Sequence, residues 1–140
     1  MNEQLNRPSW DEIWIDAAHL MARRSYDPRL KVGCVIVPED NSQILALGFN
    51  GNSKGLPNFP DSMQPGESNF IHAEQNSFYK LDCRAPGRKT LYVTHNPCLM
   101  CAKGAIQCNI QRVVYEINYR DLSGIELLKS VGVEVVRYER

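Results

Sequence analysis

The sequence has no long apolar run and no excess charge of either sign. No segment approaches the roughly 20 consecutive apolar residues that a membrane-spanning helix needs, although 43% of the 140 residues are hydrophobic. The 16 Lys and Arg residues balance 16 Asp and Glu residues, so the composition indicates no broad basic face for nucleic acid. We therefore expect neither a membrane nor a large nucleic acid as partner, whereas a small pocket for one phosphate stays compatible with this balance.

The N-terminal segment lacks the charged and then apolar layout of a secretory leader. We therefore expect a cytoplasmic protein, a compartment in which thiols stay reduced. The chain has five cysteines, an odd number that includes one close pair. This pattern suits metal binding better than a disulfide framework.

No internal repeat, low-complexity tract or linker divides the chain, and its length fits a single domain over residues 1–140. Ser9 and Glu12 form a capping box that predicts an amphipathic helix to about Arg24. The helix carries an apolar stripe at helical spacing, formed by Trp10, Ile13, Trp14, Ala17, Leu20 and Met21.

The rest of the chain predicts a mixed sheet. Two β-rich runs, 32–37 and 44–49, flank a turn and predict an antiparallel hairpin. The aperiodic stretch 50–69 is either a functional lid or a disordered insert. Downstream, strands alternate with helices, which implies parallel pairing with right-handed crossovers. We expect a helix from about His72 to Leu81, a strand Thr90–Thr94, a helix opened by Pro97, a strand Arg112–Tyr115, a helix from a capping box at Ser123 and Glu126 to Gly132, and a strand Val133–Tyr138. The fold class is α/β, with five strands and helices on both faces of the sheet.

Two short strings carry the chemistry. The first is His72-Ala73-Glu74. The second is Pro97-Cys98-Leu99-Met100-Cys101, and its first cysteine lies 26 positions after His72. Cys98 and Cys101 are three residues apart, so both sulfurs can converge from one helical turn on the same point. With His72 at the start of a neighbouring helix, these three residues predict a Zn²⁺ site whose fourth position stays open for water, as in catalytic sites.

The charge of such a site requires a nearby base. Two thiolates at a helix N-terminus balance the charge of zinc, so bound water should be less acidic than in an all-histidine site. Glu74, two residues after His72, can face this water and move its proton. General acid–base catalysis of this kind contributes roughly a hundred- to ten-thousand-fold.

The pattern H-x-E followed by P-C-x-x-C is the signature of zinc nucleobase deaminases. Beyond it, the chain resembles the cytidine and deoxycytidylate deaminase superfamily, and most of all its dCMP deaminase branch. The resemblance rests on residues 7–12, 31–33, 35–37, 48–51, 55–57, 72–76, 91–95 and 112–116.

This resemblance implies a three-layer αβα cytidine-deaminase-like fold and hydrolytic deamination of dCMP to dUMP, with release of ammonia. It implies a homo-oligomer, either a hexamer or a dimer, and a small-molecule nucleotide as substrate. It also implies substrate contacts: Asn50 for the sugar, Arg29 and Lys31 as candidates for the 5′-phosphate, and His95, Tyr119 and Ala73 at the pocket.

Other interpretations remain open. A related zinc deaminase could act on another nucleoside, a free base or adenosine in tRNA. From another class, the Cys-x-x-Cys string also fits a redox protein or a zinc-binding interaction protein. A closed structural zinc site would need a fourth ligand, for which Cys34, Cys83, Cys108 and His95 are the candidates. His19, within the first helix, is read as an ordinary helix residue.

Overall fold

The protein is described by a computed structural model over residues 6–119 and 121–140. Residues 1–5, part of the segment assessed for a secretory leader, lie outside the described range. Among the described residues, none of the helices combines the length and apolar character of a membrane span. The elements in chain order are α1 (Trp10–Ala22), β1 (Gly33–Pro38), β2 (Ala46–Phe49), α2 (Ala73–Phe78), β3 (Lys89–His95), α3 (Leu99–Gln107), β4 (Ile110–Ile117), α4 (Ser123–Ser130) and β5 (Glu134–Arg137).

The five strands form one mixed sheet in the order β2-β1-β3-β4-β5. β1 is antiparallel to both β2 and β3, whereas β3, β4 and β5 are mutually parallel. The predicted hairpin and the predicted parallel half are both confirmed. Parallel strands with helical crossovers carry their carboxyl ends to one edge of the sheet, where ligands commonly bind in α/β folds.

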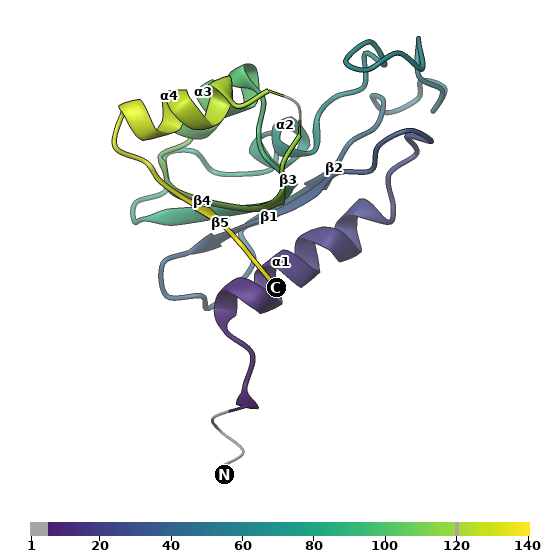
Figure 1. The fold of residues 1–140 in the computed structure, drawn as a ribbon. Coiled ribbons are helices and arrows are strands. Elements are labelled where there is room, and N and C mark those ends of the chain that lie inside the picture. The colour runs from purple at the N-terminus through teal and green to yellow at the C-terminus, as the bar shows by residue number, and fades with distance from the viewer. Residues whose placement is uncertain (1–5, 120) are drawn as a thin grey trace.

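Helices cover both faces of this sheet, as the sequence predicted. Figure 1 shows α1 on one face and α2, α3 and α4 on the other. Side chains of a strand alternate between the faces: Val35 and Val37 of β1 pack in the cluster with α1, whereas Cys34 and Ile36 pack in the cluster with the other three helices. β1 is therefore apolar throughout because it is buried on both sides.

The first helix begins as predicted, but its apolar stripe is only partly buried. Ser9 Oγ accepts a hydrogen bond from the backbone N–H of Glu12 at 3.1 Å. The buried positions of α1 are Trp14, Ile15, Ala18 and Ala22, whereas Trp10 and Leu20 are half exposed. One reason is close packing: a Cβ on Gly33 of β1 would meet the Ala18 carbonyl oxygen of α1 at only 2.1 Å, so the small residues Ala18 and Ala22 face the sheet at this point.

The last helix ends as predicted but begins differently. The expected capping box of Ser123 and Glu126 is wrong, because Ser123 is the first helical residue and Leu122 precedes it at the cap position. Asp121 supplies the cap instead: its Oδ1 accepts from the Ser123 N–H at 2.8 Å, and its Oδ2 accepts from the Ser123 hydroxyl at 3.0 Å. Gly132 follows the helix with φ of 84°, the left-handed conformation that glycine favours at a helix end.

A hydrogen-bonded ion pair joins α1 to the sheet. Asp11 accepts from both Nη1 and Nη2 of Arg112 at 2.9 Å and from the Tyr92 hydroxyl at 2.6 Å. The hydrogen bonds from Arg112 hold the pKa of Asp11 below its ordinary value, against the opposing effect of burial. The pair is partly buried, so it is screened less than a surface ion pair.

We expect Asp11→Asn to lower the free energy of unfolding by about 1–2 kcal/mol at pH 7, because charged hydrogen bonds are lost. A carboxyl with a lowered pKa stabilises the fold above its unfolded pKa of about 4 and loses this contribution as pH falls. The deficit of Asp11→Asn relative to the wild type should therefore persist down to about pH 4 and shrink only below it, as the pH falls through the lowered pKa of Asp11. Denaturant unfolding at pH 7 and at about pH 2.5 measures this. Asp16→Asn, in the more exposed pair with Arg140, is the matched control, and an equal deficit at both pH values would contradict the assignment.

Candidate active site

A cavity of about 450 Å³ lies where the segments after β2, β3 and β4 meet the start of α2. β3 and β4 are parallel neighbours, so both deliver their carboxyl ends to this cavity, the place that α/β topology favours for a ligand. The residues that line it are Asp27, Arg29, Leu30, Val32, Asn50, Gly66, Ser68, Asn69, Phe70, His72, Ala73, Glu74, His95, Asn96, Cys98, Tyr119 and Asp121.

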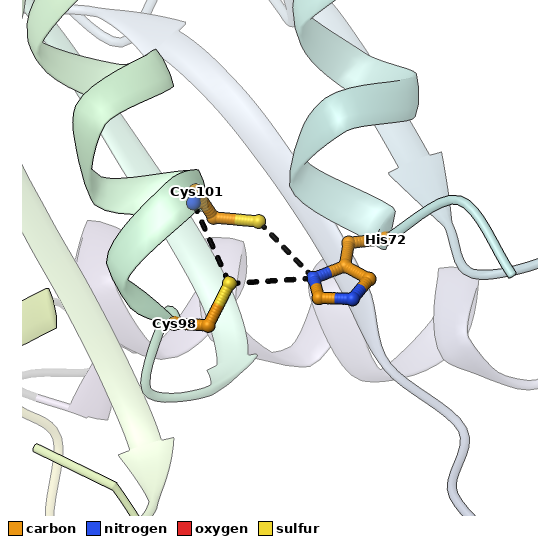
Figure 2. A group of neighbouring side chains, drawn as sticks. All are labelled: His72, Cys98 and Cys101. Atoms are coloured by element: carbon orange, nitrogen blue, oxygen red, sulfur yellow. Dashed lines mark hydrogen bonds between the residues drawn. The ribbon is translucent and has the colours of Figure 1, made fainter. Parts of the chain in front are cut away.

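Three side chains, of which His72 and Cys98 line the cavity, form a metal-binding geometry. His72 Nδ1 lies 3.3 Å from Cys101 Sγ and 3.5 Å from Cys98 Sγ, and the three ligand atoms all lie within 4.8 Å of one another. Figure 2 shows the imidazole and both thiols pointing toward one another from the starts of α2 and α3. A tetrahedral zinc with ordinary bond lengths separates nitrogen and sulfur ligands by about 3.6 Å. The donor set and its spacing therefore fit zinc.

His72 is placed by the backbone around it. It is the N-cap of α2, and its own N–H donates to Gln75 Oε1 at 3.0 Å, which is half of a capping box. The preceding residue, Ile71, pairs with Gly51 through two backbone hydrogen bonds of 2.8 and 3.1 Å. These contacts fix the backbone at position 72, so the imidazole is directed toward the cysteines.

The two thiols share one helix terminus. Cys98 is the N-cap of α3, and its sulfur accepts from the Cys101 N–H at 3.5 Å. Hydrogen bonding from Cys101 lowers the pKa of Cys98 to about 4, whereas the same pairing and burial raise the pKa of Cys101. One thiolate is therefore stabilised by the fold itself, and a coordinated cation would deprotonate the second thiol.

The backbone that carries Cys98 is supported by α4. A Cβ added at Gly124 would meet the Pro97 carbonyl oxygen at 2.3 Å and the Cys98 carbonyl oxygen at 2.7 Å. No rotamer change can relieve a clash with backbone atoms, so only glycine allows this close approach.

We expect Gly124→Ala to lower zinc affinity by roughly ten- to a hundredfold, the effect typical of disturbing the support of a metal ligand. Competition with a chromogenic chelator measures this affinity. Ser130→Ala, at the exposed end of the same helix, is the control for a general loss of helix stability. Unchanged zinc affinity in Gly124→Ala would show that α4 does not set the position of Cys98.

Glu74 lies on the first turn of α2, beside the cluster. It lines the cavity although its side chain is almost fully buried. Burial raises the pKa of Glu74 to about 7, because the charged form loses solvation. A carboxyl with a pKa near neutrality can both accept and return a proton.

Arg29, Tyr119 and Asn50 also line the cavity. The Arg29 guanidinium donates to the Tyr119 hydroxyl at 3.0 Å. The Asn50 amide donates to the Leu30 carbonyl and to Asp27, and its oxygen accepts from the Val32 N–H. Asn50 therefore holds the segment that carries Arg29.

Of the three remaining residues predicted to contact substrate, two line the cavity and one does not. Ala73 and His95 line the cavity, and His95 lies edge-on to the Tyr119 ring with centroids 6.3 Å apart. Burial lowers the pKa of His95, which favours the neutral imidazole. Lys31 is not among the lining residues, and its ammonium donates to the Ser25 carbonyl at 2.5 Å.

Sequence reasoning missed several cavity residues. Asn96 is the most informative: it is buried, its amide donates to the Asp121 carbonyl at 2.7 Å, and its oxygen accepts from the Tyr119 N–H. Asn96 thus fixes the segment after β4 in the cavity wall. The available signal was its position directly before Pro97 and the zinc cysteines. Phe70, two residues before His72, and Asp27 and Asp121 were also missed.

None of the candidates for a fourth protein ligand joins the cluster in the described part of the chain, where the group that could hold an ion comprises three residues. Cys34 donates to the Ala73 carbonyl at 3.3 Å, and Cys83 and Cys108 lie against each other. His95 bonds to the Thr94 hydroxyl at 2.8 Å. The arrangement is that of an open site rather than a closed structural one.

Comparison with known proteins agrees with this geometry. Residues 8–117 match the model for the cytidine and deoxycytidylate deaminase zinc-binding region. The chain is 35% identical to deoxycytidylate deaminase of Saccharomyces cerevisiae over 96% of its own length and 46% of that protein, and 35% identical to ComE operon protein 2 of Bacillus subtilis over 96% and 74%. The dCMP deaminase of cyanophage S-TIM5, solved with dCMP and dUMP, superposes with a TM-score of 0.82 at 33% identity, over 94% of this chain and 98% of that one. The chain thus spans about half the length of the yeast relative but nearly all of the phage protein.

Proposed function

Because the chain belongs to the cytidine and deoxycytidylate deaminase family, we propose that it converts dCMP to dUMP by zinc-dependent hydrolysis. The observation that carries this proposal is the three-ligand cluster with a buried carboxyl beside it, at a cavity that His72, Cys98 and Glu74 line. Three ligands leave a position for water, and the carboxyl supplies the base. The likeness to dCMP deaminases over nearly the whole chain supports the choice of nucleotide.

His72, Cys98 and Cys101 would hold the zinc ion. When bound, zinc supplies the Lewis acidity that makes a coordinated water more acidic. Glu74 accepts a proton from the attacking water and passes it to N3 of the cytosine ring. Glu74 then takes the remaining proton of the added hydroxyl at C4 and delivers it to the departing amino group. The C4–O bond forms, the C4–N bond breaks, and the products are the uracil nucleotide and ammonia.

Hydrolysis can be tested by following the oxygen atom. With dCMP in water enriched in oxygen-18, the dUMP formed should carry one labelled oxygen at C4, detected by mass spectrometry. A zinc-binding interaction protein or a redox protein would form no dUMP. Unlabelled dUMP, or no product from protein with full zinc occupancy, would contradict the proposal.

For the 5′-phosphate we propose Arg29, whose guanidinium lines the cavity and is oriented by Tyr119. Arginine suits phosphate because its planar donors form paired, charge-assisted hydrogen bonds. Asn50, His95 and Ala73 would contact the sugar and base from the same cavity. Lys31 is the weaker candidate because its ammonium is bound to a backbone carbonyl outside the lining.

We expect Arg29→Gln to raise KM for dCMP by roughly ten- to a hundredfold, corresponding to the loss of about 1.4–3 kcal/mol of charged hydrogen bonding. Deoxycytidine, which has no phosphate, should be deaminated by this variant at the wild-type rate. Lys31→Gln is the matched control and should change KM for dCMP little. An equal loss of deamination activity with dCMP and with deoxycytidine would contradict the assignment of Arg29 to the phosphate.

We propose that the protein is a homo-oligomer, a hexamer or a dimer. The support is the outer face of α1, on which Trp10 is 50% and Leu20 is 53% exposed beside the partly exposed Ile13. Exposed apolar patches of this kind commonly mark contacts between proteins. Sedimentation velocity of the zinc-loaded protein tests the proposal, and a monomer at micromolar concentration would contradict it.

We further propose a cytoplasmic location. The cysteine ligands must stay reduced to bind zinc as thiolates, and the cytoplasm keeps cysteines reduced. Cell fractionation of the expressed full-length protein tests this location, and recovery in a secreted or membrane fraction would contradict it.

A further inference from the structure

Two cysteines outside the zinc cluster lie in contact. Cys83 Sγ and Cys108 Sγ are 2.8 Å apart, although the residues are 25 positions apart in sequence. Cys83 belongs to the segment after α2, and Cys108 is the cap at the end of α3. The pair therefore lies at the opposite end of α3 from Cys98 and Cys101.

The backbones of both cysteines are anchored. The Asn109 side-chain amide donates to the Cys83 carbonyl at 3.1 Å, and the Cys108 N–H donates to the Gly104 carbonyl at 2.9 Å. Asn109 has a φ of 60°, a conformation that asparagine tolerates better than most residues. Because the fold holds both segments, the approach of the two sulfurs does not depend on a free loop.

The two thiols differ in access to solvent. Cys83 is partly exposed, whereas Cys108 is 5% exposed and packs in the core cluster. Burial raises the pKa of Cys108 to about 12, so this thiol is a poor nucleophile toward a reagent in solution. Cys83 is the sulfur that an external reagent can reach first.

We propose that Cys83 and Cys108 form a reversible dithiol–disulfide site, separate from the zinc site, that exchanges with low-molecular-weight disulfides of the glutathione class. The Cys83 thiolate attacks one sulfur of the reagent, forming a mixed disulfide and releasing one thiol. The Cys108 sulfur then attacks Cys83, loses its proton and releases the second thiol. The protein loses two protons and two electrons, and the reagent disulfide takes them up and is reduced to two thiols.

The new bond would connect the segment after α2 to the end of α3, and both helices begin at zinc ligands. A disulfide needs a sulfur separation of about 2.0 Å, so closure requires a shift of roughly 0.8 Å from the observed distance. α2 and α3 already touch where Phe78, the last residue of α2, packs at Gly104 so closely that a Cβ there would lie 2.8 Å from the ring. The bond would restrict the unfolded chain, and we expect the thermal midpoint to rise by roughly 5–10 °C.

The test uses the zinc-loaded full chain equilibrated with excess oxidised glutathione, after which free thiols are alkylated and the digest is analysed by mass spectrometry. We expect a Cys83–Cys108 linked peptide, unchanged zinc content, the higher thermal midpoint, and full reversal by reduced glutathione. Alkylation of both cysteines would overturn the proposal. A Cys98–Cys101 linkage with release of zinc in its place would also overturn it.

Single variants assign the order of events. Cys108→Ser should stop at a glutathione adduct on Cys83, whereas Cys83→Ser should form no adduct on Cys108, and neither should show the increase in thermal midpoint. An adduct on Cys108, or the full increase in either variant, would contradict the proposed exchange. Neither outcome depends on the deaminase assignment, because no activity is measured.

Discussion

Glu74→Gln should bind one zinc ion per chain as the wild type does but lose turnover of dCMP by about a hundred- to ten-thousandfold, the range of general acid–base catalysis. The amide has nearly the shape of the carboxyl, so α2 and the position of His72 should be retained. It cannot take the proton of water and return it to the ring nitrogen. Steady-state ammonia release, together with metal analysis of the same sample, measures both properties.

The control for this variant is Glu126→Gln, which makes the same change on the exposed face of α4 and should leave turnover unchanged. Turnover of Glu74→Gln within a fewfold of the wild type would remove Glu74 from the proton-transfer role. Loss of zinc together with activity would instead make Glu74 part of the metal site. Both outcomes contradict the roles argued from its burial and position.

Cys98→Ala and Cys101→Ala should each lose zinc binding. Loss of a direct ligand should exceed the roughly ten- to hundredfold effect of losing an outer-shell partner, because two protein ligands remain and the charge balance of the site changes. Removal of Cys101 also takes away a side chain that is fully buried between α2 and α3. We therefore expect near-zero zinc after dialysis and no measurable deamination, with metal content determined by atomic emission.

Cys83→Ser is the matched control for these variants, because Cys83 lies outside the cluster and should keep one zinc per chain. A Cys101→Ala protein that retains full zinc would contradict the three-ligand site. Formation of a Cys98–Cys101 disulfide in the wild type at full zinc occupancy would favour the redox interpretation of this string.

The zinc site was predictable because its spacing is local. Cys98 and Cys101 share one helical turn, and a residue directly before a helix, such as His72, has a side chain free to turn toward a neighbour.

The sheet order was predictable in part for the same reason: a short turn makes a hairpin, and a helical crossover makes a parallel pair. That β1 lies between β2 and β3 had to come from the structure, because no short connection links β1 to β3.

The parts that sequence reasoning missed depend on contacts between distant segments. Asn96 holds the segment of Tyr119, and Asn50 holds the segment of Arg29. The local signals for these roles are only the place of each asparagine at a strand end and, for Asn96, its position directly before Pro97. The cap of α4 was misassigned because Asp121 competes with Ser123 for the same helix end, two positions apart. The buried face of α1 is set by Gly33, a residue of another element, so the helical stripe alone could not fix it.

The most direct test of the central claim is ammonia release by the zinc-loaded protein with dCMP, CMP, deoxycytidine, cytosine, guanine and adenosine-bearing tRNA at equal concentration. We expect a clear preference for dCMP, with deoxycytidine slower because it lacks the phosphate that Arg29 would bind. Preference for another base or nucleoside would contradict the substrate assignment while leaving the chemistry of His72, Cys98, Cys101 and Glu74 in place. No ammonia from any of these substrates at full zinc occupancy would contradict the deaminase assignment itself.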